Sequence, residues 1–429
     1  MGIDNIIFLI AVCLGIGLFV RNSKRLSRAI LQGKSIGEVD RKKERFLHML
    51  RLAFGQQKMH KNLLVGVLHF VVYLGFILIN IELIEILIDG IFGTHRVLAF
   101  LGITYAIAIA TFELFAVSVI GAVVIFWFRR NVKIVARFKS AEMKGWPKLD
   151  ANLILVIEVV LMLLFLTMNA ADYALQLREE PHYPRAGLFL VSALLTPIFD
   201  SWSTPAIILI ERLAWWAHIL GILSFLNYLY YSKHLHILLA FPNTFYAQLT
   251  PKGQFTTNEI VTKEVRAMLS MQESDTPQEI ERFGAKDVTD LSWLQLMNAY
   301  SCTECGRCSE ACPANQTGKL LSPRKIMMDT RDRAEILTKS NLSMAIQEAT
   351  LLDHYISREE LWACTSCNAC VEACPIEINP LSIIMKMREY IVMEEAAAPA
   401  DLNAMMANIE NNGAPWAFNA QDRMNWVND

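Results

Sequence analysis

Charged residues are scarce in this chain of 429 residues. Only 19% of them are Asp, Glu, Lys or Arg, and 54% are hydrophobic. Soluble domains carry about 25% charged residues, so part of this chain is expected to lie in membrane lipid. The net charge of −2 gives no electrostatic basis for binding nucleic acid. The sequence also lacks a glycine-rich nucleotide-binding fingerprint. We therefore expect a site for a nucleotide-dependent substrate to lie on a partner protein.

Cysteine is nearly absent outside two short clusters. Eight of the nine cysteines lie between residues 302 and 374, and the ninth, Cys13, stands alone in an apolar run. A disulfide framework would spread its cysteines through a small secreted domain. The observed clustering instead indicates a metal site in a reducing compartment.

Five apolar runs are long enough to cross a hydrocarbon core of ~30 Å, which takes about 20 helical residues. They cover residues 3–20, 62–88, 97–128, 151–177 and 206–231. A sixth run, 186–199, is short and contains Pro197, so we expect it to lie at the surface or to re-enter. Asp4 stands where a signal peptide has basic residues, so the first run is interpreted as a retained anchor.

The loops between these runs predict the orientation. Residues 21–61 contain twelve Lys and Arg and residues 129–148 contain seven, whereas the opposite loops contain only Arg96, Arg178 and Arg185. Basic loops remain on the cytoplasmic side. We therefore expect a multi-pass protein of the cytoplasmic (inner) membrane with its N-terminus outside. The alternative is that the basic loops bind anionic lipid without setting the topology.

The composition changes after Tyr231, and no later segment could span a membrane. Pro242, Pro251, Gly253 and the polar run 273–278 indicate a linker, and the apolar spacing beyond it is helical. The expected fold is all-α, with a five-helix transmembrane bundle followed by a cytoplasmic α-helical ferredoxin domain. The expected boundaries are a bundle at 1–236, a linker at 237–289, a dicluster domain at 290–395 and a tail at 396–429.

The clustered cysteines form two quartets with the spacing C-x2-C-x2-C-x3-C-P, 62 residues apart. Three thiolates at this spacing wrap one [4Fe-4S] cluster, while the fourth reaches the other cluster. The expected ligands of cluster 1 are Cys302, Cys305, Cys308 and Cys374. The expected ligands of cluster 2 are Cys364, Cys367, Cys370 and Cys312. Structural zinc is the alternative, but it usually takes pairs of CxxC rather than two complete quartets.

The residues around these quartets carry a specific resemblance. The stretches Ala299–Cys308 and Trp362–Cys370 resemble the α-helical ferredoxin domain of the heterodisulfide reductase type, which is similar to a domain of succinate dehydrogenase iron–sulfur subunits. The resemblance covers roughly residues 290–395. Relatives of this type often continue into a cysteine-rich CCG domain, and no cysteine follows Cys374 here. The resemblance thus implies a cytoplasmic CCG-domain partner, or another dehydrogenase or reductase subunit.

Histidines at membrane depth are candidate haem ligands, because polar residues are costly there. His69 and His218 lie inside the second and fifth apolar runs, and His236 follows His218 by eighteen residues. On one continuous helix this separation is about five turns, or roughly 27 Å, which would place both on one face. That arrangement suits two stacked b haems. His234, off that face, is expected to be solvated.

The five-run plan with these histidines is similar to the di-haem membrane subunit of respiratory nitrate reductase. By that resemblance His69 pairs with His218, and His60 pairs with His236. Only nine residues separate His60 from His69, which directs them to opposite faces of a regular helix. One or two b haems are therefore expected, and the alternative for His60 is an interfacial histidine.

Acidic residues within the apolar runs point to a second site. A candidate quinone and proton site comprises Glu82, Glu85, Asp89, His95 and Arg96, which gather at the outer end of the second run. Carboxyl groups cannot be left unpaired in hydrocarbon. The alternative is a polar cluster that only packs helices together.

These features predict the membrane electron-transfer subunit of a quinone-linked oxidoreductase, with the substrate site on a partner. A non-catalytic membrane redox sensor and a structural anchor for an iron–sulfur subunit are the alternatives. The tail carries Trp416, Arg423 and Trp426, residue types typical of interfaces. We expect it to dock the partner, and the alternative is that it folds back over its own cluster domain.

Overall fold

The chain is helical in every part that the structure describes. The structure is a computed structural model, and it describes residues 2–133, 135–251, 253–255, 258–270, 282–339, 343–417 and 419–427. Within these ranges there is no strand, only two isolated β-bridges. The all-α expectation is confirmed.

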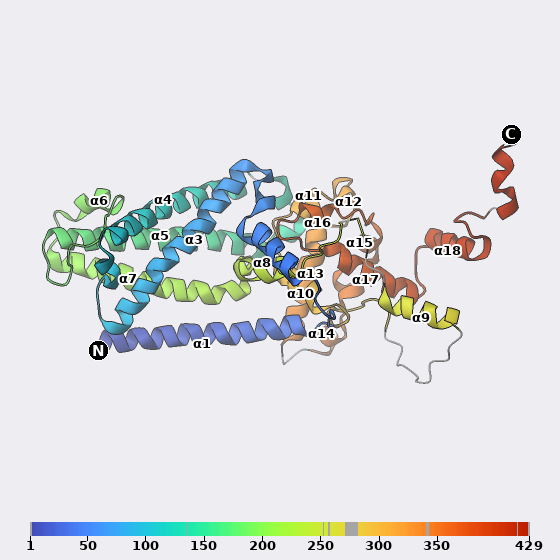
Figure 1. Cartoon of the computed structure of the whole chain (residues 1–429), viewed down its shortest axis with the longest axis horizontal. Helices are drawn as coiled ribbons and strands as arrows, with labels where there is room; N and C mark the ends of the chain where they lie inside the picture. Colours follow the sequence, from blue (N-terminus) through green and yellow to red (C-terminus); the bar gives the residue numbers. More distant parts are fainter. Residues whose placement is uncertain are drawn as a thin grey trace.

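Five long apolar helices form the first half of the molecule (Figure 1). They are α1 (Ile3–Leu31), α3 (Leu63–Phe92), α4 (Ile103–Asn131), α5 (Trp146–Leu177) and α7 (Thr204–Tyr228). Each is long and apolar enough to cross a membrane, by length and composition. Many large apolar side chains on them face outward, including Leu63, Ile107 and Leu209. These features identify a membrane protein. The segment 186–199 contains only the short helix α6 (Ser192–Leu195) and a 3₁₀ turn.

The five helices pack as a closed ring. Helix α3 packs on α4, α4 on α5, α5 on α7, α7 on α1 and α1 on α3. Glycines permit close approach: a Cβ at Gly90 would lie 2.5 Å from the Phe8 ring, and one at Gly75 would lie 2.7 Å from Val119. The bundle core includes Phe8, Ile109 and Phe165.

The fifth long helix ends before His236, so the expectation that His218 and His236 share one helix face is wrong. Helix α7 ends at Tyr228, a 3₁₀ turn follows, and Ser232 is extended before α8 (His236–Phe245) begins. The break is stabilised by α5, because Asp150 accepts a hydrogen bond from the Lys233 backbone N–H at 3.0 Å. The Ser232 hydroxyl accepts one from the His234 N–H.

Part of the segment expected as a linker is packed structure. Helix α8 lies against α2 (Lys42–Met49) and α10 (Trp293–Tyr300), and its Asn243 and Thr244 are fully buried. Helix α9 (Glu259–Ser270) follows. The polar run 273–278 lies outside the described residues.

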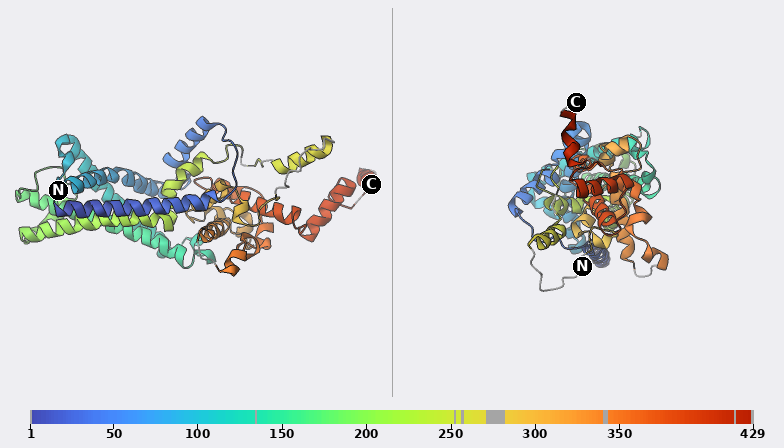
Figure 2. Two further views of the ribbon diagram at one scale, coloured as in Figure 1. Left: turned by 90° about the horizontal axis from the view of Figure 1, so that it is seen from below. Right: turned by 90° about the vertical axis from the view of Figure 1, so that its right-hand side faces the viewer.

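A second helical body follows the bundle in space (Figures 1 and 2). Its remaining helices are α11 (Arg307–Glu310), α12 (Pro313–Gln316), α13 (Pro323–Leu337), α14 (Met344–Glu348), α15 (Arg358–Trp362), α16 (Ala369–Ala373) and α17 (Pro380–Met393). Helix α1 reaches this body, where Lys34 and Leu291 share a backbone hydrogen bond of 2.7 Å. Helix α18 (Ala400–Asn412) leads away from it and buries none of its residues.

Candidate functional site

The two cysteine loops repeat one local structure. In the first loop, Glu304 and Gly306 have left-handed φ angles of 55° and 74°. Ser366 and Asn368 hold the same two positions in the second loop, with φ angles of 56° and 60°. The backbone N–H of Glu304 donates to the Cys302 Sγ at 3.4 Å, as that of Ser366 does to the Cys364 Sγ. The two loops thus share the same two left-handed positions and the same N–H···S hydrogen bond.

The fourth cysteine of each quartet lies with the other quartet. The short helices α11 and α16 pack side by side. Burial, together with the nearby Cys305 and Cys374, raises the pKa of the Cys302 thiol to about 12. Burial likewise raises the pKa of Cys370 to about 12, with Cys364 and Cys312 adding to the effect. Cys374 is thus near thiols of the first quartet and Cys312 near thiols of the second, while Cys308 is also near Cys370.

The eight thiols differ in exposure. Cys302, Cys312 and Cys370 are buried, and Cys367 is exposed. In the described part of the chain, no three His, Cys, Asp or Glu side chains are grouped closely enough to hold one metal ion.

His69 and His236 face each other where the bundle meets the cysteine domain. Their ring centroids are 6.5 Å apart, with an interplanar angle of 47°. The Nδ1 atom of His69 lies 3.0 Å from the Gln56 Oε1, and that of His236 lies 3.2 Å from the Lys233 carbonyl oxygen. Both rings are oriented through Nδ1, and in the described structure no hydrogen bond engages either Nε2.

His218 has the same hydrogen-bonding pattern deeper in the bundle. It is 2% exposed, and its Nδ1 lies 3.0 Å from the Leu161 carbonyl oxygen. Its ring lies 6.1 Å from that of Phe165. His69, which the resemblance pairs with His218, therefore lies beside His236 instead. The chain turns after α7, and this turn places His236 against the bundle.

His60 stands apart from these three. It is exposed, in a 3₁₀ helix (Gln57–Lys61) that Asn62, with φ −116°, separates from α3. His60 and His69 therefore do not lie on one regular helix, and their spacing does not determine which way the two side chains face. His60 lines a pocket of about 700 Å³ with Leu47, Leu50, Arg51, Gly55 and Gln57.

His234 was expected to be solvated, but it is largely buried. Its Nε2 lies 3.6 Å from the Glu158 Oε1, its side chain is 16% exposed, and its ring lies 5.4 Å from that of Phe225. Burial lowers the pKa of His234 to about 3. Its Nε2, rather than its Nδ1, faces a polar partner, in contrast to His69, His218 and His236.

An ion-pair chain joins the turn before His236 to the first cysteine loop. The Lys233 ammonium pairs with Glu304, which is 3% exposed and also pairs with Arg331 at 2.9 Å. Lys233 lies 3.8 Å from Asp150 at the end of α5. The guanidinium of Arg307, between Cys305 and Cys308, is near enough to His69 to act on it electrostatically. These contacts bring the turn before His236 to the first cysteine loop.

Other ion pairs, buried or half-buried, hold the cysteine domain against the bundle. Arg324 pairs with Glu142 at 2.7 Å, and Arg25 pairs with Glu335 at 2.6 Å. Glu377, in the turn after Cys374, pairs with Lys58 at 3.0 Å. Sequence reasoning missed these residues, because each pair joins segments far apart in the chain.

The five residues of the candidate quinone and proton site come together at the end of the bundle remote from the cysteine domain. Arg96 contacts Glu82 at 3.1 Å, and its backbone N–H donates to Asp89 at 2.7 Å. Glu85 accepts hydrogen bonds from the Leu98 N–H and the Tyr105 hydroxyl, both at 2.9 Å.

Helix α5 completes this group with residues that the sequence did not single out. Asp172 accepts a hydrogen bond from Arg96 at 2.8 Å and lies 3.4 Å from His95. Asn169 accepts another from Arg96 at 2.7 Å. They lie near the end of the fourth apolar run, and only the packing of α5 against α4 reveals their role.

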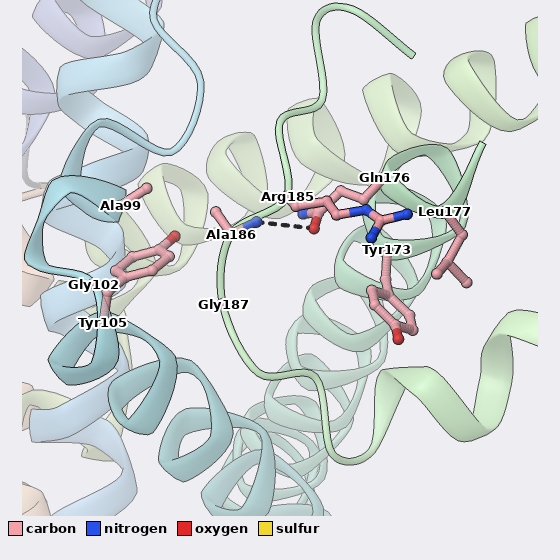
Figure 3. A pocket seen from close by; sticks show the side chains of 9 residues that line it. All are labelled: Ala99, Gly102, Tyr105, Tyr173, Gln176, Leu177, Arg185, Ala186 and Gly187. Atoms are coloured by element: carbon pink, nitrogen blue, oxygen red, sulfur yellow. Dashed lines mark hydrogen bonds between the residues drawn. The ribbon is translucent and has the colours of Figure 1, made fainter. Parts of the chain in front are cut away.

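A pocket of about 370 Å³, the remote pocket, adjoins this group of polar residues (Figure 3). Tyr105 and Gln176 belong to both the pocket wall and the group. The Gln176 Oε1 accepts a hydrogen bond from the Ala186 N–H at 3.1 Å. The pocket is lined by Ala99, Gly102, Tyr105, Tyr173, Gln176, Leu177, Arg185, Ala186 and Gly187.

Comparisons with known proteins agree with the cysteine pattern. A family model described as a 4Fe-4S dicluster domain matches residues 301–378. The chain is 28% identical to the probable iron-sulfur-binding oxidoreductase FadF of Bacillus subtilis, over 99% of this chain and 60% of the relative. It is 24% identical to the EtfAB:quinone oxidoreductase of Syntrophomonas wolfei, over 95% of this chain and 57% of the relative.

A shorter match concerns the expected resemblance directly. The chain is 28% identical to a heterodisulfide reductase-like protein of Archaeoglobus profundus, over 28% of this chain and 52% of the relative. No solved structure matches. The chain spans about 60% of the length of these two relatives, FadF and the EtfAB:quinone oxidoreductase. It is thus a membrane chain with a 4Fe-4S domain, similar to iron–sulfur oxidoreductases, and the haem part of the resemblance stays a prediction.

Proposed function

We propose that this protein carries electrons across the membrane between the quinone pool and a soluble partner that bears a substrate site. The observation that carries the proposal is the juxtaposition of His69 and His236 with the first cysteine loop. When bound, two [4Fe-4S] clusters and b haem supply one-electron carriers between a quinone and the partner. The quinone-linked and iron–sulfur names of the relatives support this assignment.

The cysteines fit two cross-ligated clusters. Cys302, Cys305, Cys308 and Cys374 would hold cluster 1, and Cys364, Cys367, Cys370 and Cys312 would hold cluster 2. The neighbours of Cys302 and Cys370 support this division. The 4Fe-4S match favours it over zinc. The exposure of Cys367 makes the surface around it the place where a partner can approach cluster 2.

The histidines fit at least one haem. His69 and His236, whose ring centroids lie 6.5 Å apart, would hold one b haem, which would supply a one-electron carrier there. Hydrogen bonds at Nδ1 fix the ring orientation, as is usual for metal-binding histidines. His218 shares that pattern and is the candidate for a second haem, and His60 remains a fourth candidate.

The remote pocket is the proposed quinone site. Apolar side chains such as Leu177 suit the ring, while Tyr105, Gln176 and Arg185 offer polar contacts for its oxygens. Glu82, Glu85, Asp89, His95 and Arg96 lie behind this wall. In the proposed orientation this end faces outward, and the cluster domain lies in the cytoplasm, where a CCG-domain or other redox subunit would dock.

One optical experiment tests the proposal. Detergent-purified full-length protein should show a sharp α-band typical of b haem after dithionite reduction, and menadiol should produce the same band. Bleached cluster absorbance without any α-band would support the sensor or anchor alternatives. A band that dithionite produces but menadiol does not would reject the quinone link.

A further inference from the structure

The polar group beside the remote pocket contains more buried carboxyl groups than cations. Its carboxyl groups are Glu82, Glu85, Glu113 and Asp172, each at most 2% exposed. Arg96 is the guanidinium among them, and His95 faces Asp172. Even with His95 charged, the carboxyl groups outnumber the cations, and excess charge in a lipid-embedded bundle is costly. At least one carboxyl group is therefore protonated.

Hydrogen-bond partners identify which carboxyl group holds the proton. Glu113 accepts from Val191 N–H at 2.8 Å, Ser192 N–H at 3.2 Å and Asn169 at 3.4 Å. Donors also reach both oxygens of Glu85 and both oxygens of Asp172. A carboxylate that accepts hydrogen bonds at both oxygens is stabilised as an anion.

Glu82 differs from the other three. Its Oε1 accepts a hydrogen bond from Arg96 at 3.1 Å, but its Oε2 is buried and has no hydrogen-bond partner in the described structure. An ionised oxygen without a donor is the costliest arrangement in such a site, whereas a protonated carboxyl group tolerates it. Glu82 is thus the group that carries the proton.

Tyr105 reaches both the pocket and Arg96, which contacts Glu82. Its ring lines the pocket wall (Figure 3), and its hydroxyl donates to Glu85 at 2.9 Å. One nitrogen of Arg96 lies 3.3 Å from the Tyr105 hydroxyl and 3.1 Å from Glu82. The hydroxyl therefore lies between the pocket and the buried carboxyl groups.

We infer that Glu82 stores a proton which Tyr105 exchanges with a quinone in the remote pocket. This inference rests on the proposed quinone site. Reduction of the quinone takes two electrons, one at a time, from the one-electron carriers of the proposed function, and two protons. The Tyr105 hydroxyl gives one proton to a quinone oxygen and is reprotonated from the Glu82 store. The second proton comes from water at this end of the bundle, and quinol oxidation reverses these transfers.

Infrared difference spectroscopy on the full-length protein in nanodiscs tests the store directly. With menadione bound and reduced electrochemically, the wild type should lose the C=O band of a protonated carboxylic acid. Glu82→Gln should abolish that band while menadione binding and cofactor content stay unchanged. Asp200→Asn, at an exposed acid of the same end, should behave as the wild type.

Kinetics provide the second readout. Menadiol should reduce the Glu82→Gln protein about 100-fold more slowly than the wild type, the usual scale of lost proton transfer. Tyr105→Phe should give a similar loss and retain the Glu82 band in the oxidised state. An unchanged band or an unchanged rate in Glu82→Gln would overturn the proton store. Failure of the wild type to bind menadione would instead reject the proposed quinone site.

Discussion

Cys374 follows the second cysteine loop in sequence but lies against the first. Changing Cys374 to Ser should therefore damage the cluster held by Cys302, Cys305 and Cys308, because the fourth thiolate of that cluster is lost. The wild type should contain about eight irons beyond any haem iron. Electron paramagnetic resonance of the reduced variant can identify the remaining cluster. Selective loss of the cluster held by Cys364, Cys367 and Cys370 would contradict the assignment.

The contact between His69 and His236 gives a different haem prediction from the pairing expected from the resemblance. His69→Ala and His236→Ala should each abolish the same haem signal, because one axial imidazole alone does not hold the site. His218→Ala should leave that signal and remove a second one if two haems are bound. Reduced-minus-oxidised spectra of the three variants check this. Full haem content in both the His69 and His236 variants would reject the proposed ligand pair.

Asp329 should make the stability of the cysteine domain depend on pH. Burial raises the pKa of Asp329 from 3.8 to about 6, although Lys325 lies 2.7 Å away. The folded state therefore binds more protons than the unfolded state between these values. The resulting stabilisation is complete below about pH 4 and is lost as the pH rises through about 6.

Asp329→Asn removes this titration. At pH 7.5 the variant should unfold at a higher temperature than the wild type, because its unfolding free energy should be larger by up to about 3 kcal/mol. This difference in stability should be smaller at pH 5. Thermal unfolding followed by circular dichroism at both pH values measures it. An equal gain at both values would show that titration of Asp329 is not the cause.

Among the elements, the turn between α7 and α8 brings the histidine pair to the first cysteine loop. Lys233 in this turn is 9% exposed and pairs with the buried Glu304. Lys233→Met leaves Glu304 with Arg331 alone, which should cost about 1–3 kcal/mol of stability. Electron transfer from haem to cluster should slow by about tenfold while iron and haem contents persist. Flash photoreduction can follow it, and Lys233→Arg should retain most of the rate.

This turn also shows where prediction from sequence ends. The cysteine spacing is a local pattern, so both quartets and the helical character of the chain could be predicted. Residues 229–235 contain no Gly or Pro, and the break there depends on Asp150 from another helix. Glu82 was recognisable as an acidic residue in an apolar run, and Arg96 as a charged residue just beyond it. Asp172, Asn169 and Tyr105 join them only through helix packing, which one sequence does not encode visibly.

At the scale of the whole molecule, the described part of the tail is largely exposed. Helix α18 buries no residue, and Trp416 and Trp426 are 51% and 73% exposed. Deleting the residues after Ala400 should leave both clusters and the haem in place and abolish co-purification of the soluble redox partner. Replacing both tryptophans with Ser should weaken that binding, since exposed aromatic residues are frequent interface anchors. Loss of clusters on truncation would favour a tail that supports its own domain.

The unequal burial of the eight thiols has a consequence for survival in air. Cys367 lies at the surface, whereas Cys302, Cys312 and Cys370 are buried. Oxidants reach exposed, thiolate-bearing sites first. Brief aeration should therefore erode the partner-facing cluster before the membrane-facing one. In the proposed function, such damage would interrupt electron transfer between the quinone and the soluble partner in either direction, and Cys367 would be the site at which oxygen stops it.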